Sequence, residues 1–479
     1  MSMPAMTFQR PATGRHPVVA SAPANAEPRP DRLMRAVALM LFTYVWRIQD
    51  AFPILGKLQL ALLALFAAVI MFAGVRHPAR AVNSIRNQTT SKLIVAFVII
   101  MLIGVPFSLW RGHSAEFFLK SYMPNVVFYV LVASTVRTIR DVEWYALMNL
   151  YGALAFATVV AIFFHVGGDG RLGGLIYYDA NDFALVMVCT IPFAFYFLGK
   201  GQRGSRRIAA LIALGMFLTA MVKSGSRGGF IGLIAVMLYI LLFYKAIPSR
   251  TRLLITIAGV VLFFGFASDK YWTMMGTILH PTTDYNYTSN EGRVEVWKRG
   301  TTYMLRNPVV GVGVAAYPMA EGGSDLALSL QAQGAGFKWS VAHNSFLETG
   351  AELGFPGLVV FVAMLVVTGV ALSKISRRGR WAPWVSMREI SLAQMLMASI
   401  VGFAVSGIFV SAEYFAYLYF LLALSVGLIK LVRMRAMAFP PARPQINVRL
   451  APRAPPAEAD LGSVRNTIEA SIHGAAPKR

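Results

Sequence analysis

The chain has 479 residues, of which 56% are hydrophobic and only 14% are charged. Soluble domains carry charged side chains at about a quarter of their positions, so this composition excludes an ordinary soluble protein and predicts a polytopic membrane protein. The formal net charge of +23 does not indicate a nucleic-acid partner, because the cations flank apolar segments and no basic helix or base-stacking platform accompanies them.

Residues 1–32 are rich in Pro, Ala and Arg and have no apolar core, which predicts a disordered cytoplasmic tail rather than a cleaved signal peptide. The same bias returns at 436–479, where we expect a second disordered cytoplasmic tail. Residues 33–435 between them form the predicted membrane domain. Its only cysteine, Cys189, lies in an apolar run, so no intramolecular disulfide can form.

About twelve apolar stretches in this domain are long enough to cross ~30 Å of hydrocarbon as α-helices. The expected spans are 34–50, 54–75, 92–110, 114–135, 142–165, 181–199, 207–223, 228–245, 252–268, 344–372, 389–410 and 412–432. The first span is a weak prediction because it carries Arg47 and Asp50, and the fourth because it carries Glu116 and Lys120. We therefore predict an all-α polytopic membrane protein.

Alternate short loops hold most of the cations, which by the positive-inside rule places those loops in the cytoplasm. These cations are Arg76, Arg80, Arg86, Lys92, Arg137, Arg140, Lys200, Arg203, Arg206, Arg207, Lys245, Arg250, Arg252, Lys374, Arg377, Arg378, Arg380 and Arg388. We accordingly expect both termini inside the cell and the long loop at 269–343 outside it.

The 269–343 loop is too long for a simple connector, and loops of this length are usually functional. Within it, residues 292–305 have helical spacing with apolar side chains on one side, which predicts an amphipathic helix on the outer leaflet. The Asn307-Pro308 pair and the glycines at 311 and 313 then end that helix. The loop is thus expected to contain short helices.

Polar residues precede the span that begins at 181. Asp179 and Asn181 suit the N-cap of that helix, and contact with a sugar hydroxyl is the second interpretation. Arg171, in a glycine-rich stretch on the same side of the membrane, is a further candidate for anion contact. A metal site needs more convergent oxygen ligands than this segment offers, so no metal is expected.

Two arginines lie in similar polar breaks. Arg227 follows Ser224-Gly225-Ser226 and precedes Gly228-Gly229, so its guanidinium and the amides at a helix start would together bind an anion such as phosphate. The alternative is an ordinary helix-end arginine whose side chain extends to the interface. Arg293 has the same two interpretations, the second being a surface charge on an amphipathic helix.

His343 precedes the apolar run that starts at 344. Asn344 and Ser345 can each N-cap this helix, and Ser345-x-x-Glu348 fits a capping box. The positive end of the helix dipole disfavours a charged imidazole, so His343 would stay neutral and able to accept a proton. The alternative is a polar helix cap with an incidental histidine. Further along, Pro356 is expected to kink the segment.

Three motifs resemble the O-antigen ligase and polymerase superfamily over roughly residues 35–435. They are Ser226-Arg227-Gly228-Gly229, the turn from Asn307-Pro308 to Gly311-Val312-Gly313, and His343-Asn344 followed by Gly354-Phe355-Pro356-Gly357. The resemblance implies a membrane glycosyltransferase that moves a glycan from undecaprenyl diphosphate to an acceptor at the periplasmic face of the bacterial inner membrane. It implies no nucleotide sugar, metal or other cofactor.

The resemblance also assigns roles to residues. It implies that His343 is the essential catalytic histidine and that Arg227 and Arg293 bind the diphosphate. Arg171, Asp179, Asn181 and Asn344 are left as possible sugar or acceptor contacts. One departure is Ile231, where ligases often have Leu at the fourth place after the arginine. Because of this departure, the resemblance does not decide between a ligase and a polymerase.

Three kinds of glycan transferase remain as hypotheses, and they differ in the acceptor that receives the glycan. We favour lipid A-core, the acceptor of a ligase, over a second lipid-linked glycan for a polymerase or a Ser or Thr for a protein O-oligosaccharyltransferase. A transporter or flippase would show intramembrane charges and broken helices in matching halves, whereas here the distinctive polar residues lie at one face. A structural scaffold would not need His and Arg at outer helix ends.

Overall fold

The computed structural model describes residues 30–47, 49, 52–75, 78–167, 170–175, 178–280, 282, 284–377 and 385–438. The predicted tails at 1–32 and 436–479 fall almost entirely outside these ranges, as do the cations Arg76, Arg378 and Arg380. Apart from one isolated bridge between Val166 and Leu172, the described residues contain no β-structure. The predicted all-α class is confirmed.

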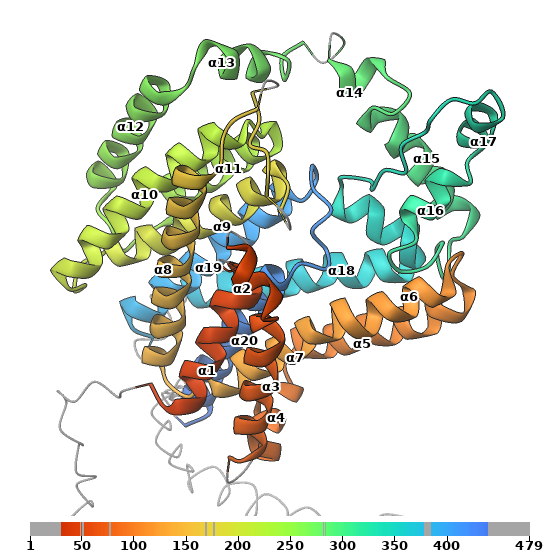
Figure 1. Ribbon diagram of the computed structural model, residues 1–479. Helices are drawn as coiled ribbons and strands as arrows, with labels where there is room; N and C mark the ends of the chain where they lie inside the picture. The colour runs from red at the N-terminus through yellow and green to blue at the C-terminus, as the bar shows by residue number, and fades with distance from the viewer. Residues whose placement is uncertain are drawn as a thin grey trace, which may run out of the picture. The chain divides into compact units, whose positions relative to one another are not determined.

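The helices follow one another along the whole described chain (Figure 1). They are α1 (Arg32–Met40), α2 (Pro53–Lys57), α3 (Leu60–Ala73), α4 (Pro78–Arg86), α5 (Thr89–Gly104), α6 (Arg111–Phe117), α7 (Met123–Thr135), α8 (Ile139–Phe163), α9 (Ala180–Leu198), α10 (Gly204–Ser224), α11 (Arg227–Phe243), α12 (Ser249–Phe266), α13 (Asp269–Gly276), α14 (Tyr285–Thr288), α15 (Arg293–Arg306), α16 (Tyr317–Gly322), α17 (Asp325–Ala332), α18 (Ser345–Arg377), α19 (Met387–Ser406) and α20 (Ala416–Ala438).

Nine helical segments among the described residues are long and apolar enough to cross a membrane. They are Thr89–Phe107, Arg111–Thr135, Ile139–Phe163, Ala180–Leu198, Gly204–Ser224, Ser249–Phe266, Ser345–Arg377, Met387–Ser406 and Ala416–Met437. Each lies on one of the twelve expected spans. The multi-pass membrane protein is therefore confirmed, including the charged span at 114–135.

The three other expected spans, at 34–50, 54–75 and 228–245, are occupied by shorter helices. α3 has 14 residues and α11 has 17, while α1 continues only through a π-helical turn to Val45. Two of these helices are limited by residues in the left-handed region: Arg47 has φ 46° just beyond the first, and Gln59 has φ 47° just before α3. Such residues interrupt the hydrogen-bond pattern of a helix.

Capping residues set where several spans begin. α8, α9 and α19 each start with a complete capping box, in which the N-cap side chain and the third helical residue exchange hydrogen bonds with main-chain amides. The pairs are Thr138 with Asp141, Asp179 with Asp182, and Ser386 with Glu389. The predicted N-cap role of Asp179 is therefore confirmed.

The core lies around α9, α19 and α20. About nine-tenths of the apolar window of α9 and of α20 is buried (89% each), against only 6% for α12. α9 packs against α8, α10, α11 and α19, and its Cys189 is free and buried. α12 leaves its apolar side chains uncovered by protein, as expected for a helix that faces lipid.

The long loop contains the short helices α13 to α17, drawn in green and teal in Figure 1. The amphipathic helix expected at 292–305 is α15, Arg293–Arg306. It buries Val296 and Gly300 and packs against α18. α15 is therefore packed on α18, and its expected position on the outer leaflet stays a prediction.

α18 is broken at Gly354, which has φ 67° and ψ −172°. The turn at 308–313 fills this break: the Phe355 amide donates to the Pro308 carbonyl (2.8 Å) and the Val312 amide to the Ala351 carbonyl (2.8 Å). The kink expected at Pro356 therefore lies two residues earlier. Pro356 stands in the first turn after the break, where a helix needs no amide donor.

Candidate functional site

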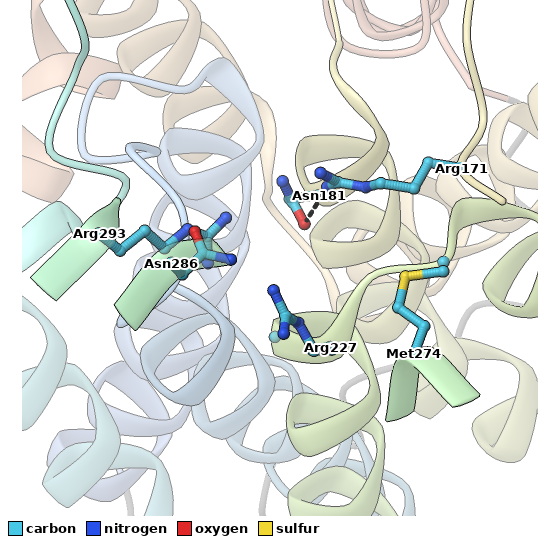
Figure 2. A pocket seen from close by; sticks show the side chains of 8 residues that line it. Arg171, Asn181, Arg227, Met274, Asn286 and Arg293 are labelled. Atoms are coloured by element: carbon cyan, nitrogen blue, oxygen red, sulfur yellow. Dashed lines mark hydrogen bonds between the residues drawn. The ribbon is translucent and has the colours of Figure 1, made fainter. Parts of the chain in front are cut away.

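Three distant segments meet around two adjoining cavities. Arg227 begins α11, Arg293 begins α15 and His343 directly precedes α18. The first cavity is lined by Arg171, Asn181, Gly225, Arg227, Gly228, Met274, Asn286 and Arg293. The second is lined by Arg171, Asp179, Asn181, Asn286, Glu291, Arg293, Val296, Lys338, Ser340 and His343. Figure 2 shows the guanidinium groups of Arg171, Arg227 and Arg293 on different sides of the first cavity.

The start of α11 fixes where Arg227 lies. Ser226 is the N-cap: its hydroxyl accepts from the Gly229 amide (3.1 Å) and donates to Asn181 Oδ1 (2.9 Å). Gly229 is required at its position because a Cβ there would come 2.5 Å from the Cβ of Ala184. The amide of Gly229 is thus used within the cap and is not free to bind a ligand.

Arg227 is held by the long loop. Its Nη1 donates to Asp284 Oδ2 and to Thr277 Oγ1, both at 2.6 Å, and its side chain is only 26% exposed. Partial burial alone would raise the pKa of Asp284, but hydrogen bonds from Arg227 and Asn286 lower it to about 2. Arg227 is therefore not a snorkelling interfacial arginine, because it is directed into the site and paired with an ionised carboxylate.

Arg293 differs from Arg227 in having no carboxylate of the described residues within salt-bridge distance, although the negative charges of Asp179 and Asp284 act on it from farther away. Its side chain makes no hydrogen bond and no ion pair within the described part of the chain. Burial, and then the charges of Arg171 and Arg227, lower the pKa of Arg293 to about 10, so it stays protonated at neutral pH. A half-buried cation without a partner is unfavourable, so this side of the cavity is suited to an anionic ligand.

Arg171 and Asn181 join the two cavities. Arg171 Nη2 donates to Asn181 Oδ1 (3.0 Å), and both residues line both cavities. Asp179 accepts from the amides of Asn181 and Asp182 as the N-cap of α9, and it also lines the second cavity. Its capping role and its contact with the cavity therefore coexist.

His343 enters the second cavity from a main chain in the left-handed region, with φ 50°. Burial, and then the positive charge of Arg293, lower its pKa to about 4. The imidazole is therefore neutral at neutral pH and can accept a proton. The sequence had indicated the neutral form from the helix dipole, and the structure adds burial and a facing guanidinium as causes.

The expected capping box at the start of α18 is wrong. Asn344 is the cap, and its Oδ1 accepts from the amides of Phe346 and Leu347, both at 3.1 Å. Ser345 instead bonds the turn between α19 and α20, with its hydroxyl donating to the Val410 carbonyl (2.6 Å). Asn344 lines neither cavity, so the expected sugar or acceptor contact by Asn344 has no support in this geometry.

Several residues of the site were not expected from the sequence. They are Thr277, Asp284, Asn286, Glu291, Lys338 and Ser340. Asp284 and Asn286 stand in a stretch without periodicity, and their only signal was a cluster of polar residues in an unusually long loop. Among the described residues, no three His, Cys, Asp or Glu side chains are grouped as metal ligands.

The central part of the chain matches a known family. Residues 210–362 match the family model described as O-antigen ligase. This segment contains Arg227, Arg293 and His343, whereas Arg171, Asp179 and Asn181 precede it. No curated protein gives a significant match. The resemblance indicated by the sequence motifs is therefore confirmed.

Proposed function

We propose a specific reaction for this membrane protein, whose residues 210–362 match the O-antigen ligase family model. The chain transfers a glycan from undecaprenyl diphosphate to lipid A-core at the periplasmic face of the bacterial inner membrane. The observation that carries this proposal is the convergence of His343, Arg227 and Arg293 on adjoining cavities, where Arg293 forms no ion pair with the described residues.

The charges of the first cavity suit a diphosphate. Arg171, Arg227 and Arg293 supply three guanidinium groups, and each can bind phosphate oxygens with paired hydrogen bonds. In our mechanism they hold the donor and stabilise the negative charge that develops on the leaving oxygen. Fixed charges aimed at such developing charge are often the largest contribution to catalysis.

A third, mainly apolar cavity adjoins the first on the side of Arg227 and Arg293. Its lining residues are Arg227, Gly228, Ile231, Thr277, Ile278, Asp284, Asn286, Tyr287, Arg293, Val294, Trp297 and Phe409. An isoprenoid chain leaving the diphosphate could lie against these apolar side chains. The adjacent cationic and apolar cavities support a lipid diphosphate as the donor over a nucleotide sugar.

In the chemical step, the acceptor hydroxyl oxygen attacks the anomeric carbon while the bond from that carbon to the diphosphate oxygen breaks. The hydroxyl proton passes to the imidazole of His343, and the electron pair leaves with the diphosphate. A single displacement of this kind inverts the configuration of the sugar. General-base assistance typically contributes about 10²–10⁴-fold to the rate.

The test is transfer by the purified protein from a labelled lipid-diphosphate glycan, with lipid A-core, a second lipid-linked glycan or a Ser/Thr peptide supplied separately. We expect label on lipid A-core only. His343→Gln should abolish transfer while the donor still binds, because the arginines are intact. His113→Ala serves as the matched control, since His113 stacks on Trp110 and lines none of the three cavities. Parental transfer by His343→Gln would reject the proposed mechanism.

A further inference from the structure

The main chain at His343 has a conformation that needs support. A φ of 50° lies in the left-handed region, which histidine adopts less readily than glycine because its Cβ crowds the neighbouring carbonyl. Residues are kept there only when the surroundings fix them. The groups that fix the neighbours of His343 therefore also determine where its imidazole lies.

Two side chains hold the residue before it. Trp297 donates its indole N–H to the Ala342 carbonyl (2.8 Å), and the Ala342 amide donates to Glu348 Oε2 (3.0 Å). Glu348 in turn accepts from the hydroxyl of Ser411. Ala342 itself is fully buried. Both main-chain polar groups of Ala342 are thus hydrogen-bonded by side chains of two different helices, Trp297 of α15 and Glu348 of α18.

Trp297 also belongs to the donor side of the site. It lines the apolar cavity together with Arg227 and Arg293. Arg293 and Trp297 are four residues apart on α15, so they lie on the same face of that helix. One helix thus presents both the unpaired guanidinium and the indole that holds the backbone next to His343.

We propose that Trp297 is a positioning residue for the reaction: its indole N–H holds the Ala342 carbonyl and so keeps the imidazole of His343 at the second cavity, while its ring forms part of the apolar cavity wall. This inference rests on the proposed function, in which His343 is the base and the apolar cavity takes the lipid of the donor.

The test is Trp297→Phe, which keeps an aromatic ring in the cavity wall but removes the N–H. The Ala342 carbonyl then loses its partner and the His343 segment loosens. We expect kcat to fall by about tenfold to a hundredfold, since displacement of a catalytic group by about 1 Å can cost about 10²-fold. KM for the lipid-diphosphate donor should stay within about twofold, because the apolar wall and the arginines remain.

A second readout separates positioning from general damage. The charged residues that line the second cavity with His343 are Arg171, Asp179, Glu291, Arg293 and Lys338. Burial and the positive charges of Arg293, Lys338 and Arg171 lower the pKa of His343 to about 4, whereas the negative charge of Asp179 raises it. A loosened imidazole gains water, so in Trp297→Phe the acid limb of the kcat profile should move from near pH 4 toward the ordinary histidine value of about 6.5. A folding defect would lower the amount of active enzyme and leave this limb in place.

The control is Trp110→Phe. Trp110 is 49% exposed and stacks on His113, so this variant should keep the parental kcat, KM and pH profile. Each sample is first checked for a monodisperse folded fraction, and rates are expressed per folded protein. The inference is overturned if Trp297→Phe keeps the parental kcat per folded protein, loses kcat without a shift of the acid limb, or changes only the donor KM. These results leave the proposed function standing, because that function is rejected by active His343→Gln and not by any Trp297 variant.

Discussion

At the scale of single residues, the two main arginines of the site are in different states. Arg227 already holds a carboxylate, Asp284, at 2.6 Å, and both side chains are largely shielded from water. Arg293 has no such partner. If the proposed function holds, a donor diphosphate would bind Arg293 directly but would have to share or replace Asp284 at Arg227. We therefore expect Asp284 to compete with the diphosphate for Arg227.

Replacing this carboxylate tests that competition. In Asp284→Asn the side chain loses its charge, so Arg227 is freed for phosphate, and the dissociation constant for inorganic pyrophosphate should fall about threefold to tenfold. Calorimetric titration of the purified protein measures it. Asp325→Asn, at an exposed position that lines none of the three cavities, is the matched control. Weaker pyrophosphate binding by Asp284→Asn would mean that Asp284 orients Arg227 rather than competing for it.

The pH dependence of this pair has a defined sign. The pKa of Asp284 is lowered to about 2 from an ordinary 3.8, so the carboxylate contributes stability that is complete above pH 3.8 and is lost as pH falls toward 2. Asp284 is therefore still charged when pyrophosphate is titrated at pH 5. Lowering the pH to 5 should not free Arg227 as the Asp284→Asn substitution does.

Sequence reasoning could identify the residues at helix starts but not their loop partners. Arg227, Arg293 and His343 each stand where a predicted helix begins, and the cation pattern assigned all three to one side of the membrane. Asp284 and Asn286 lie in a loop whose path depends on tertiary packing, so no periodicity indicated that they would reach Arg227. The catalytic roles of these residues remain predictions.

At the scale of elements, the broken helix α18 links two of the sequence motifs. The turn at 308–313 supplies hydrogen-bond partners for the residues around Gly354. This contact joins the segment that follows α15 to the segment that follows His343. The glycine motif after the histidine and the Asn-Pro motif of the loop therefore serve one structural purpose, the relative placement of α15 and α18.

Gly354→Ala tests this element. The glycine has φ 67° and ψ −172°, a region open almost only to glycine, and a Cβ there would come 2.6 Å from the Pro308 carbonyl oxygen. We expect a loss of roughly 2–4 kcal/mol in stability, measured as a lower thermal unfolding midpoint in detergent. Gly265→Ala in α12, where no atom lies within 4 Å of the added Cβ, should leave the midpoint unchanged or raise it. Equal midpoints for the two variants would show that the break does not require glycine.

The sequence predicted elements well where local signals decide them. The helix expected at 292–305 is Arg293–Arg306. Of the two residues expected to cap α9, Asp179 is the N-cap and Asn181 lies in the first turn of the helix. The capping box at Ser345 failed because the hydroxyl of that residue bonds Val410, a partner 65 residues away that no local pattern reveals. The break at Gly354 was misplaced to Pro356 because the turn that stabilises it lies in another part of the chain.

At the scale of the whole molecule, two helices run from the candidate site to loops that contain basic residues. α9 and α11 have 19 and 17 residues, which makes them about 28 and 25 Å long at about 1.5 Å per residue. Both begin at the site and end just before basic loops, with Lys200 after α9 and Lys245 after α11. Because these lengths approach the thickness of the hydrocarbon core, we expect the site and these cations to lie at opposite membrane surfaces.

This arrangement predicts the orientation of the protein, which thiol labelling can measure. The native Cys189 is buried, so cysteines introduced at exposed positions report alone. With a membrane-impermeant maleimide added to intact spheroplasts, Ala335→Cys in the long loop should react, whereas Ser205→Cys at the start of α10 should react only after permeabilisation. Labelling of the parental protein gives the background. The reverse pattern would place the loop in the cytoplasm, where periplasmic lipid A-core could not reach His343, and the proposed acceptor would then be wrong even if glycan transfer itself were retained.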